Sequence, residues 1–77
     1  MRFPNKQEVD HVRRMYPAGT RVELIAMDDP QAPPAGTRGT IITVDDLGDL
    51  VVAWDNGCGL NVVPWVDRVR IITEEQG

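Results

Sequence analysis

Hydrophobic positions near the start of the chain recur at helical spacing and predict one short helix over about residues 5–16. One face of this helix would carry Val9, Val12 and either Met15 or Tyr16. Asn5 followed by Glu8 is the pattern of a capping box, which satisfies free backbone N–H groups at a helix start. Pro17 comes directly after the pattern and ends the helix.

From Thr20 onward the hydrophobic period changes to two, which predicts β-strands. The expected strands cover about residues 20–27, 40–44, 50–55, 58–63 and 68–72. Trp54 shares a face with Leu50 and Val52, and we therefore expect it in the core. Asn56-Gly57 predicts a tight type I′ hairpin, since both positions of that turn require a positive φ.

The connections between these strands differ in length in a way that is typical of one small barrel. A long, proline-stiffened loop covers residues 28–39, a turn covers 45–49, and a short turn covers Pro64–Asp67. We expect a mainly β fold: a small SH3-like five-stranded barrel with one N-terminal α-helix. The chain of 77 residues is expected to form a single domain. Its parts would be the helix at about 5–16, the barrel at about 19–72 and a polar tail at 73–77.

The charge of the chain is negative and unevenly distributed. The formal net charge is −4. Residues 1–21 are mostly basic in their charged groups, whereas residues 22–57 are mostly acidic, with Arg38 as their only cation. This balance argues against broad, non-specific nucleic-acid binding, which needs many phosphate-neutralising cations. Nucleic-acid binding by the basic N-terminal segment alone remains an alternative.

The cysteine count and the small size narrow the function classes further. Cys58 is the single cysteine, so no internal disulfide forms, as is usual in a reducing cytoplasm. No stretch predicts a signal peptide or a membrane span, and we expect a cytoplasmic protein with no membrane partner. A thin core leaves little room for a deep catalytic cleft. We therefore expect neither an enzyme nor a bound cofactor or metal.

Residues 16–72 resemble the small bacterial and phage proteins grouped as domain of unknown function 4314. The stretches that carry the resemblance are "GTRVEL", "MDDPQAPPAGTRGTI", "VDDLG" and "WDNG". The resemblance implies an SH3-like barrel that is frequently carried on mobile elements and prophages. It implies no activity and supplies no catalytic residue. A shorter resemblance, through "GTRGTIITV", is to ribosome- and transcription-associated SH3-like modules.

Acidic residues gather in two loops of the expected barrel, which we expect to converge with Trp65 at one rim. The function that this pattern favours is a non-enzymatic binding module with an unidentified protein partner. The candidate partner-binding residues are Asp28, Asp29, Pro33, Pro34, Asp45, Asp46, Asp49 and Trp65. Ordinary turn chemistry is the alternative for the aspartates, and core packing is the alternative for Trp65.

The basic segment supports a second hypothesis, a nucleic-acid-binding accessory protein. Its candidate residues are Lys6, Arg13, Arg14, Tyr16 and Arg21. Small barrels that bind nucleic acid combine cations with stacking aromatics, and Phe3 and Trp65 are the other aromatics available. The same cations are equally suited to pair with the acidic loops, within the molecule or in a neighbour.

Three further readings follow from the same residues. An acidic, phage-type protein is a candidate inhibitor of a host nuclease. The edges of so small a sheet suit a homodimer. A catalytic thiol at Cys58 would need His11 as its base, which makes this the weakest reading.

Overall fold

The predicted helix forms over Lys6–Met15 (α1) in the computed structural model, which describes residues 4–73. Its capping box is complete: the Glu8 amide donates to the Asn5 side-chain oxygen at 2.8 Å, and the Asn5 amide donates to the Glu8 carboxylate at 3.0 Å. Val9 and Val12 are buried, as their spacing predicted. Tyr16 caps the other end of the helix through its amide, which donates to Val12 O.

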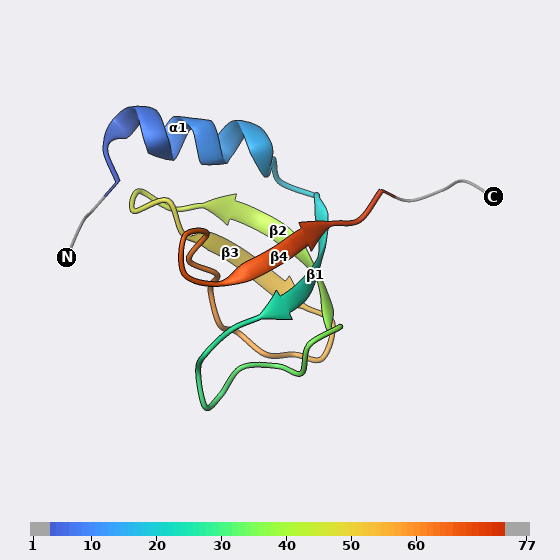
Figure 1. Cartoon of the computed structure of the whole chain (residues 1–77). Coiled ribbons are helices and arrows are strands. Elements are labelled where there is room, and N and C mark those ends of the chain that lie inside the picture. Colours follow the sequence, from blue (N-terminus) through green and yellow to red (C-terminus); the bar gives the residue numbers. More distant parts are fainter. Residues whose placement is uncertain (1–3, 74–77) are drawn as a thin grey trace.

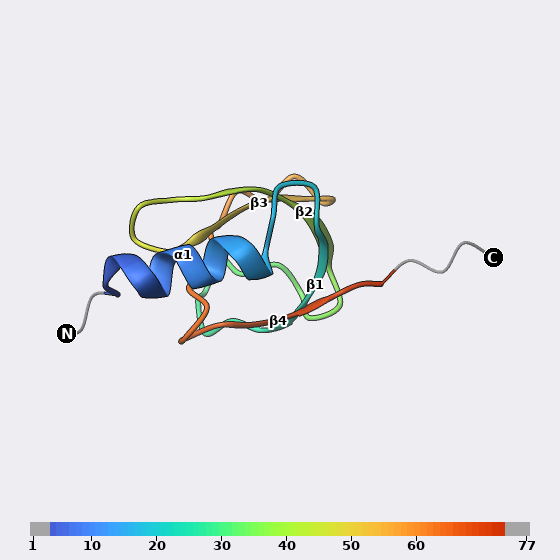
Figure 2. The same cartoon turned by 90° about the horizontal axis from the view of Figure 1, so that it is seen from above.

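Four antiparallel strands follow, in the spatial order β3-β2-β1-β4. They are β1 (Arg21–Ala26), β2 (Arg38–Val44), β3 (Leu50–Trp54) and β4 (Arg68–Ile71). The sheet curls without closing, and α1 lies across its upper end in Figure 1. Seen from above, α1 lies between the β2–β3 side and the β4 side (Figure 2). The mainly β class is confirmed.

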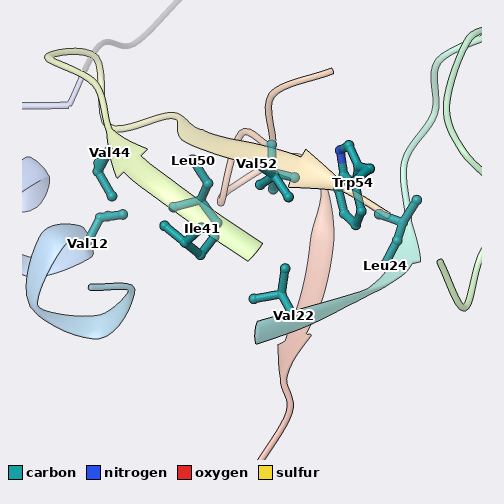
Figure 3. Close-up of a cluster of buried hydrophobic side chains, with 9 residues drawn as sticks. Val12, Val22, Leu24, Ile41, Val44, Leu50, Val52 and Trp54 are labelled. Carbon is teal, nitrogen blue, oxygen red and sulfur yellow. The ribbon is translucent and has the colours of Figure 1, made fainter. Parts of the chain in front are cut away.

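The core lies inside this curl and is built of aliphatic side chains together with Trp54, which lies at one end of the cluster (Figure 3). Trp54 is 4% exposed, which confirms its predicted place in the core. Its indole N–H donates to Leu60 O at 2.8 Å, so the one polar atom of the ring is satisfied. Gly39 permits this packing, because a Cβ there would lie 2.9 Å from the Trp54 ring and 2.7 Å from Val52.

A β-bulge in β2 connects the sheet to the helix. The pairing of β2 with β3 shifts register between Ile41 and Thr43. Without the extra residue, Val44 would face away from Ile41, because side chains alternate along a strand. With it, both residues are buried, and Val44 points toward Val12 of α1 (Figure 3). The bulge therefore places Val44 on the face of β2 against which α1 packs.

The predicted five-stranded barrel is not what forms, because residues 58–63 do not make a strand. A single bridge joins this segment to β3, with Val62 and Leu50 exchanging hydrogen bonds of 2.9 and 2.7 Å. The rest of the segment is held in other ways. Cys58 N donates to the Asn56 side chain, and Leu60 O accepts from Trp54. Cys58 N and Leu60 O are therefore not available for the backbone hydrogen bonds that a continuous strand would make with β3.

The predicted type I′ hairpin at Asn56-Gly57 is also wrong. Among the described residues only glycines have positive φ, and Gly57 is one of them at 87°. Gly57 N donates to Trp54 O at 2.9 Å, so Asp55 and Asn56 are the central residues of the turn. Gly57 then stands at the last position, where a type I turn favours glycine.

The remaining boundaries agree closely with the predicted ones. The turn at Pro64–Asp67 forms, with Asp67 N donating to Val63 O at 2.8 Å and Val63 N donating to the Asp67 carboxylate at 2.9 Å. Most of the predicted polar tail, residues 74–77, lies outside the described residues, as does Phe3. No helix within residues 4–73 is long and apolar enough to cross a membrane.

Candidate functional site

The two acidic loops lie at opposite ends of β2, so the single rim expected from the sequence does not exist. Residues 28–36 precede Arg38, whereas residues 45–49 follow Val44 (Figure 1). At about 3.3 Å per residue, a strand of 7 residues separates the two loops by about 20 Å. The prediction failed because it assumed barrel loops that meet, whereas these loops flank one extended strand.

In the first loop, the predicted residues have unlike environments. Pro33 is buried and Pro34 is exposed. Asp29 accepts a hydrogen bond from Gln31 N at 2.8 Å, which is ordinary turn chemistry, while Asp28 is exposed. Pro33 and Asp28 line a shallow pocket of about 340 Å³ beside β1.

Turn chemistry also explains Asp45 in the second loop. Its carboxylate accepts from Leu47 N at 2.9 Å and from Asp49 N at 3.0 Å. Asp46 instead points outward and pairs with Arg13 of α1 at 3.2 Å. Gly48 completes the turn with a φ of 83°.

Trp65 belongs with this second loop. A Cβ at Gly48 would lie 3.0 Å from the outer edge of the Trp65 ring. The indole therefore rests against the turn, yet Trp65 remains 46% exposed. One side of the ring is packed and the rest faces solvent, which settles where Trp65 lies.

A groove runs between α1 and the Pro64–Trp65 turn, and we call it the helix–turn groove. Its volume is about 460 Å³. The lining residues that matter below are Glu8, His11, Met15, Tyr16, Pro64 and Trp65. Met15 is 47% exposed, close to the value for Trp65, so the groove presents two large hydrophobic side chains to solvent. No Lys or Arg of the described chain lines it.

Sequence reasoning found only part of this groove. It singled out Trp65, and it named Tyr16 for the nucleic-acid hypothesis, but it missed Met15, Pro64 and His11 as lining residues. One signal in the sequence could have indicated the groove. The apolar face of the helix needs only one of Met15 and Tyr16, so the other must lie outside the core. Tyr16 packs against the core, and Met15 is the apolar residue left over.

Negative charge gathers beside Trp65. Asp49 and Asp45 lie in the turn that supports its ring, and Asp67 lies in the same turn as Trp65 itself. Burial raises the pKa of Asp49, and the neighbouring charges of Asp45 and Asp67 raise it further. We call these three residues the acidic cluster. No Lys or Arg within residues 4–73 forms an ion pair with any of them.

The acidic cluster is not arranged as a metal centre. Within the described part of the chain, no group of three or more His, Cys, Asp or Glu side chains has the geometry to hold a metal ion. Two carboxylate groups of the cluster, those of Asp45 and Asp67, already accept backbone hydrogen bonds that shape their turns.

Most of the residues of the nucleic-acid hypothesis are engaged within the molecule. Arg21 forms two hydrogen bonds with Asp55, at 2.9 and 2.7 Å. Lys6 pairs with Asp10 at 3.0 Å. These contacts lower the pKa values of both carboxyls, through the hydrogen bond from Arg21 to Asp55 and that from Lys6 to Asp10.

Arg13 joins the helix to the second acidic loop. Its guanidinium donates to the backbone oxygens of Val44 and Asp45 and to the Asp46 carboxylate, at 3.2 to 3.3 Å. The pairing of a basic helix residue with an acidic loop thus occurs within the molecule. Arg14 is exposed and Tyr16 is half-buried.

The weakest catalytic reading, a Cys58–His11 pair, has no support in the geometry. The Cys58 thiol lies 3.8 Å from Gln31 O, in the long loop below the sheet in Figure 1. His11 lines the helix–turn groove on α1, at the other end of the molecule.

Comparison with known proteins adds a family and no activity. The model of a family described as Domain of unknown function (DUF4314) matches residues 5–72. This match confirms the resemblance inferred from the sequence. No curated protein and no solved structure matches the chain at a significant level.

Proposed function

Because the chain belongs to the DUF4314 family, whose description assigns no activity, we propose from the geometry that it is a small, non-enzymatic module that binds another protein. The observation that carries the proposal is the helix–turn groove, in which Met15 and Trp65 stand about half exposed. Aromatic and methionine side chains are enriched at protein interfaces and depleted on ordinary surface.

The working surface of this proposal differs from the rim expected from the sequence. Trp65, Asp45, Asp46 and Asp49 remain in it, because the groove and the 45–49 turn adjoin each other at Gly48. Asp28, Asp29, Pro33 and Pro34 drop out, since their loop lies at the other end of β2.

Two finer points belong to the same proposal. The Leu50–Val62 bridge lies where a fifth strand would pair, which supports kinship with SH3-like barrels. The single Cys58 supports a cytoplasmic location, and the family resemblance favours a bacterial or phage source.

The test is capture of binding proteins from the native host's lysate by the tagged chain, with and without added nuclease, read by mass spectrometry. The two matched variants are Trp65→Ala in the groove and Ile42→Ala, which alters a side chain 54% exposed on β2. We expect the same proteins on wild type and Ile42→Ala, and about tenfold less or none on Trp65→Ala.

Two results would contradict the proposal. Equal capture by Trp65→Ala would remove the groove from binding. Capture that disappears with nuclease would transfer the function to nucleic acid. Met15→Glu is a second groove variant that leaves Trp65 in place, so a folding defect peculiar to Trp65→Ala does not decide the outcome.

A further inference from the structure

The groove alone requires an apolar group from its occupant. Its volume of about 460 Å³ falls within the range of about 300–1,000 Å³ that is typical of ligand sites. Met15, Pro64 and Trp65 offer it mostly carbon surface. Burial of a large hydrophobic side chain between Met15 and Trp65 would remove both from water, which is the main source of binding energy at such a surface.

The surroundings of the groove require positive charge from the same occupant. The acidic cluster lies next to Trp65, in the two turns that hold its ring. The side chains of Asp45, Asp49 and Asp67 are half-buried, so they are less well screened by water than fully exposed carboxylates. The raised pKa of Asp49 has the same cause, because its charge is opposed by burial and by Asp45 and Asp67.

The cations within residues 4–73 do not supply that positive charge to the acidic cluster. Of its described cations, those in ion pairs use other acids: Asp10, Asp46, Asp55 and Glu23. Arg13 bonds to the Asp45 backbone and the Asp46 carboxylate rather than to a carboxylate of the acidic cluster. Among the described residues the acidic cluster thus has no Lys or Arg in an ion pair, and a cation of a partner protein would complement it.

We infer that the helix–turn groove binds a basic segment of a partner protein. A large apolar side chain of that segment enters between Met15 and Trp65, and a neighbouring Lys or Arg lies against the acidic cluster. The inference rests on the proposed function and adds the chemical class of the partner. Complementary charge of this kind sets specificity and association rate, while the apolar contact holds the complex together.

Three synthetic peptides of equal length test the inference on the full chain. One alternates Leu and Lys, one replaces every Lys by Glu, and one replaces every Leu by Ser. Binding is followed by two-dimensional NMR of the isotope-labelled protein at one fixed pH. The indole signal of Trp54, buried and bonded to Leu60 O, is the internal control for that of Trp65.

We expect the Leu–Lys peptide to shift the Trp65 signal and leave Trp54 unmoved. Its affinity should fall between about 50 and 300 mM salt, because screening weakens the charge contact. Asp49→Asn should weaken it by about two- to fivefold, the range for one partly exposed ion pair. Asp28→Asn removes the same charge at the far end of β2 and should change nothing.

The remaining outcomes separate the two proposals. If the Glu peptide binds at Trp65 as tightly as the Lys peptide, the basic partner is wrong while the groove remains a docking site. An equal loss in Asp28→Asn also overturns the basic partner, because the effect is then one of net charge. If the Trp65 signal moves with protein concentration and no peptide, a second copy is the occupant. If no peptide shifts the Trp65 signal, and Trp65→Ala captures the same proteins from lysate as wild type, both the basic partner and the protein-binding groove are wrong.

Discussion

Among single residues, Asp49 is the clearest case of a side chain whose charge costs stability. Its carboxyl is half-buried and has a raised pKa, first through burial and then through Asp45 and Asp67. Between the unfolded and the folded pKa, the native chain binds more protons than the unfolded chain. The free energy of unfolding therefore falls as pH rises through that interval, and the loss persists at neutral pH.

Asp49→Asn should accordingly stabilise the protein at neutral pH, with a difference from wild type that shrinks as the pH is lowered until Asp49 is protonated. Urea unfolding at several pH values measures this difference. Asp28→Asn is the control, since Asp28 is exposed and its replacement should leave the midpoint unchanged. A destabilised Asp49→Asn would show that the carboxylate makes a favourable contact. A variant that is more stable and yet binds the basic peptide more weakly cannot owe its weaker binding to unfolding.

Among the elements, α1 depends most on its own local interactions. A helix of 10 residues is marginal by itself in water. It is held by the capping box at Asn5 and by Val12, which packs on Val44 above the bulge of β2. The stability of α1, which forms one wall of the helix–turn groove, thus depends on the capping box and on the contact between Val12 and Val44.

Asn5→Ala should loosen α1 more than the sheet. It removes the hydrogen bond from Glu8 N to the Asn5 side chain, at a cost of about 1 kcal/mol. Hydrogen exchange of the α1 amides should then rise about fivefold relative to wild type, with less change in β1 and β2. Gln7→Ala, at an exposed position in the same turn, is the control. An equal rise in every element would show that α1 opens only with the whole molecule.

The helix was predictable because its signals are local. The Asn5–Glu8 pair and the Val9–Val12 spacing act within one or two turns, so the sequence contains them complete. Residues 58–63 were misread because a side chain outside the segment takes one of its backbone groups: the Trp54 indole donates to Leu60 O, and only Val62 pairs with β3. The Asn56-Gly57 turn was also misread, although its determinant is local: the Asn56 side chain accepts from Cys58 N and favours another turn than the type I′ turn that the dipeptide suggests.

In the whole molecule, a thin core bears nearly all of the stability. Leu24, Ile41, Leu50, Val22 and Val62 are its largest fully buried side chains. The described residues form one buried hydrophobic cluster, so a loss of packing in it is not compensated by a second core among them. The sequence indicated Trp65 as a candidate residue but not the groove around it, because the position of Trp65 beside Gly48 follows from the path of the whole chain.

Leu50→Ala should lower the free energy of unfolding by about 2–5 kcal/mol. The substitution leaves a cavity in the core and removes packing beside the Leu50–Val62 bridge. A domain of this size has little stability in reserve, so much of the variant should be unfolded at room temperature. Leu47→Ala makes the same change at a side chain 53% exposed, and its cost should stay within about 0.5 kcal/mol. Chemical denaturation of both variants measures the contrast, and equal costs would contradict the assignment of Leu50 to the core.

The two walls of the helix–turn groove come from segments far apart in the sequence, residues 5–16 and residues 64–65. A nascent chain therefore has no groove until residues 64–65 have been synthesised and have packed beside α1. A partner that recognises both walls distinguishes the folded domain from a chain in which the two segments have not come together. By binding only the folded domain, it also shifts the folding equilibrium toward that state.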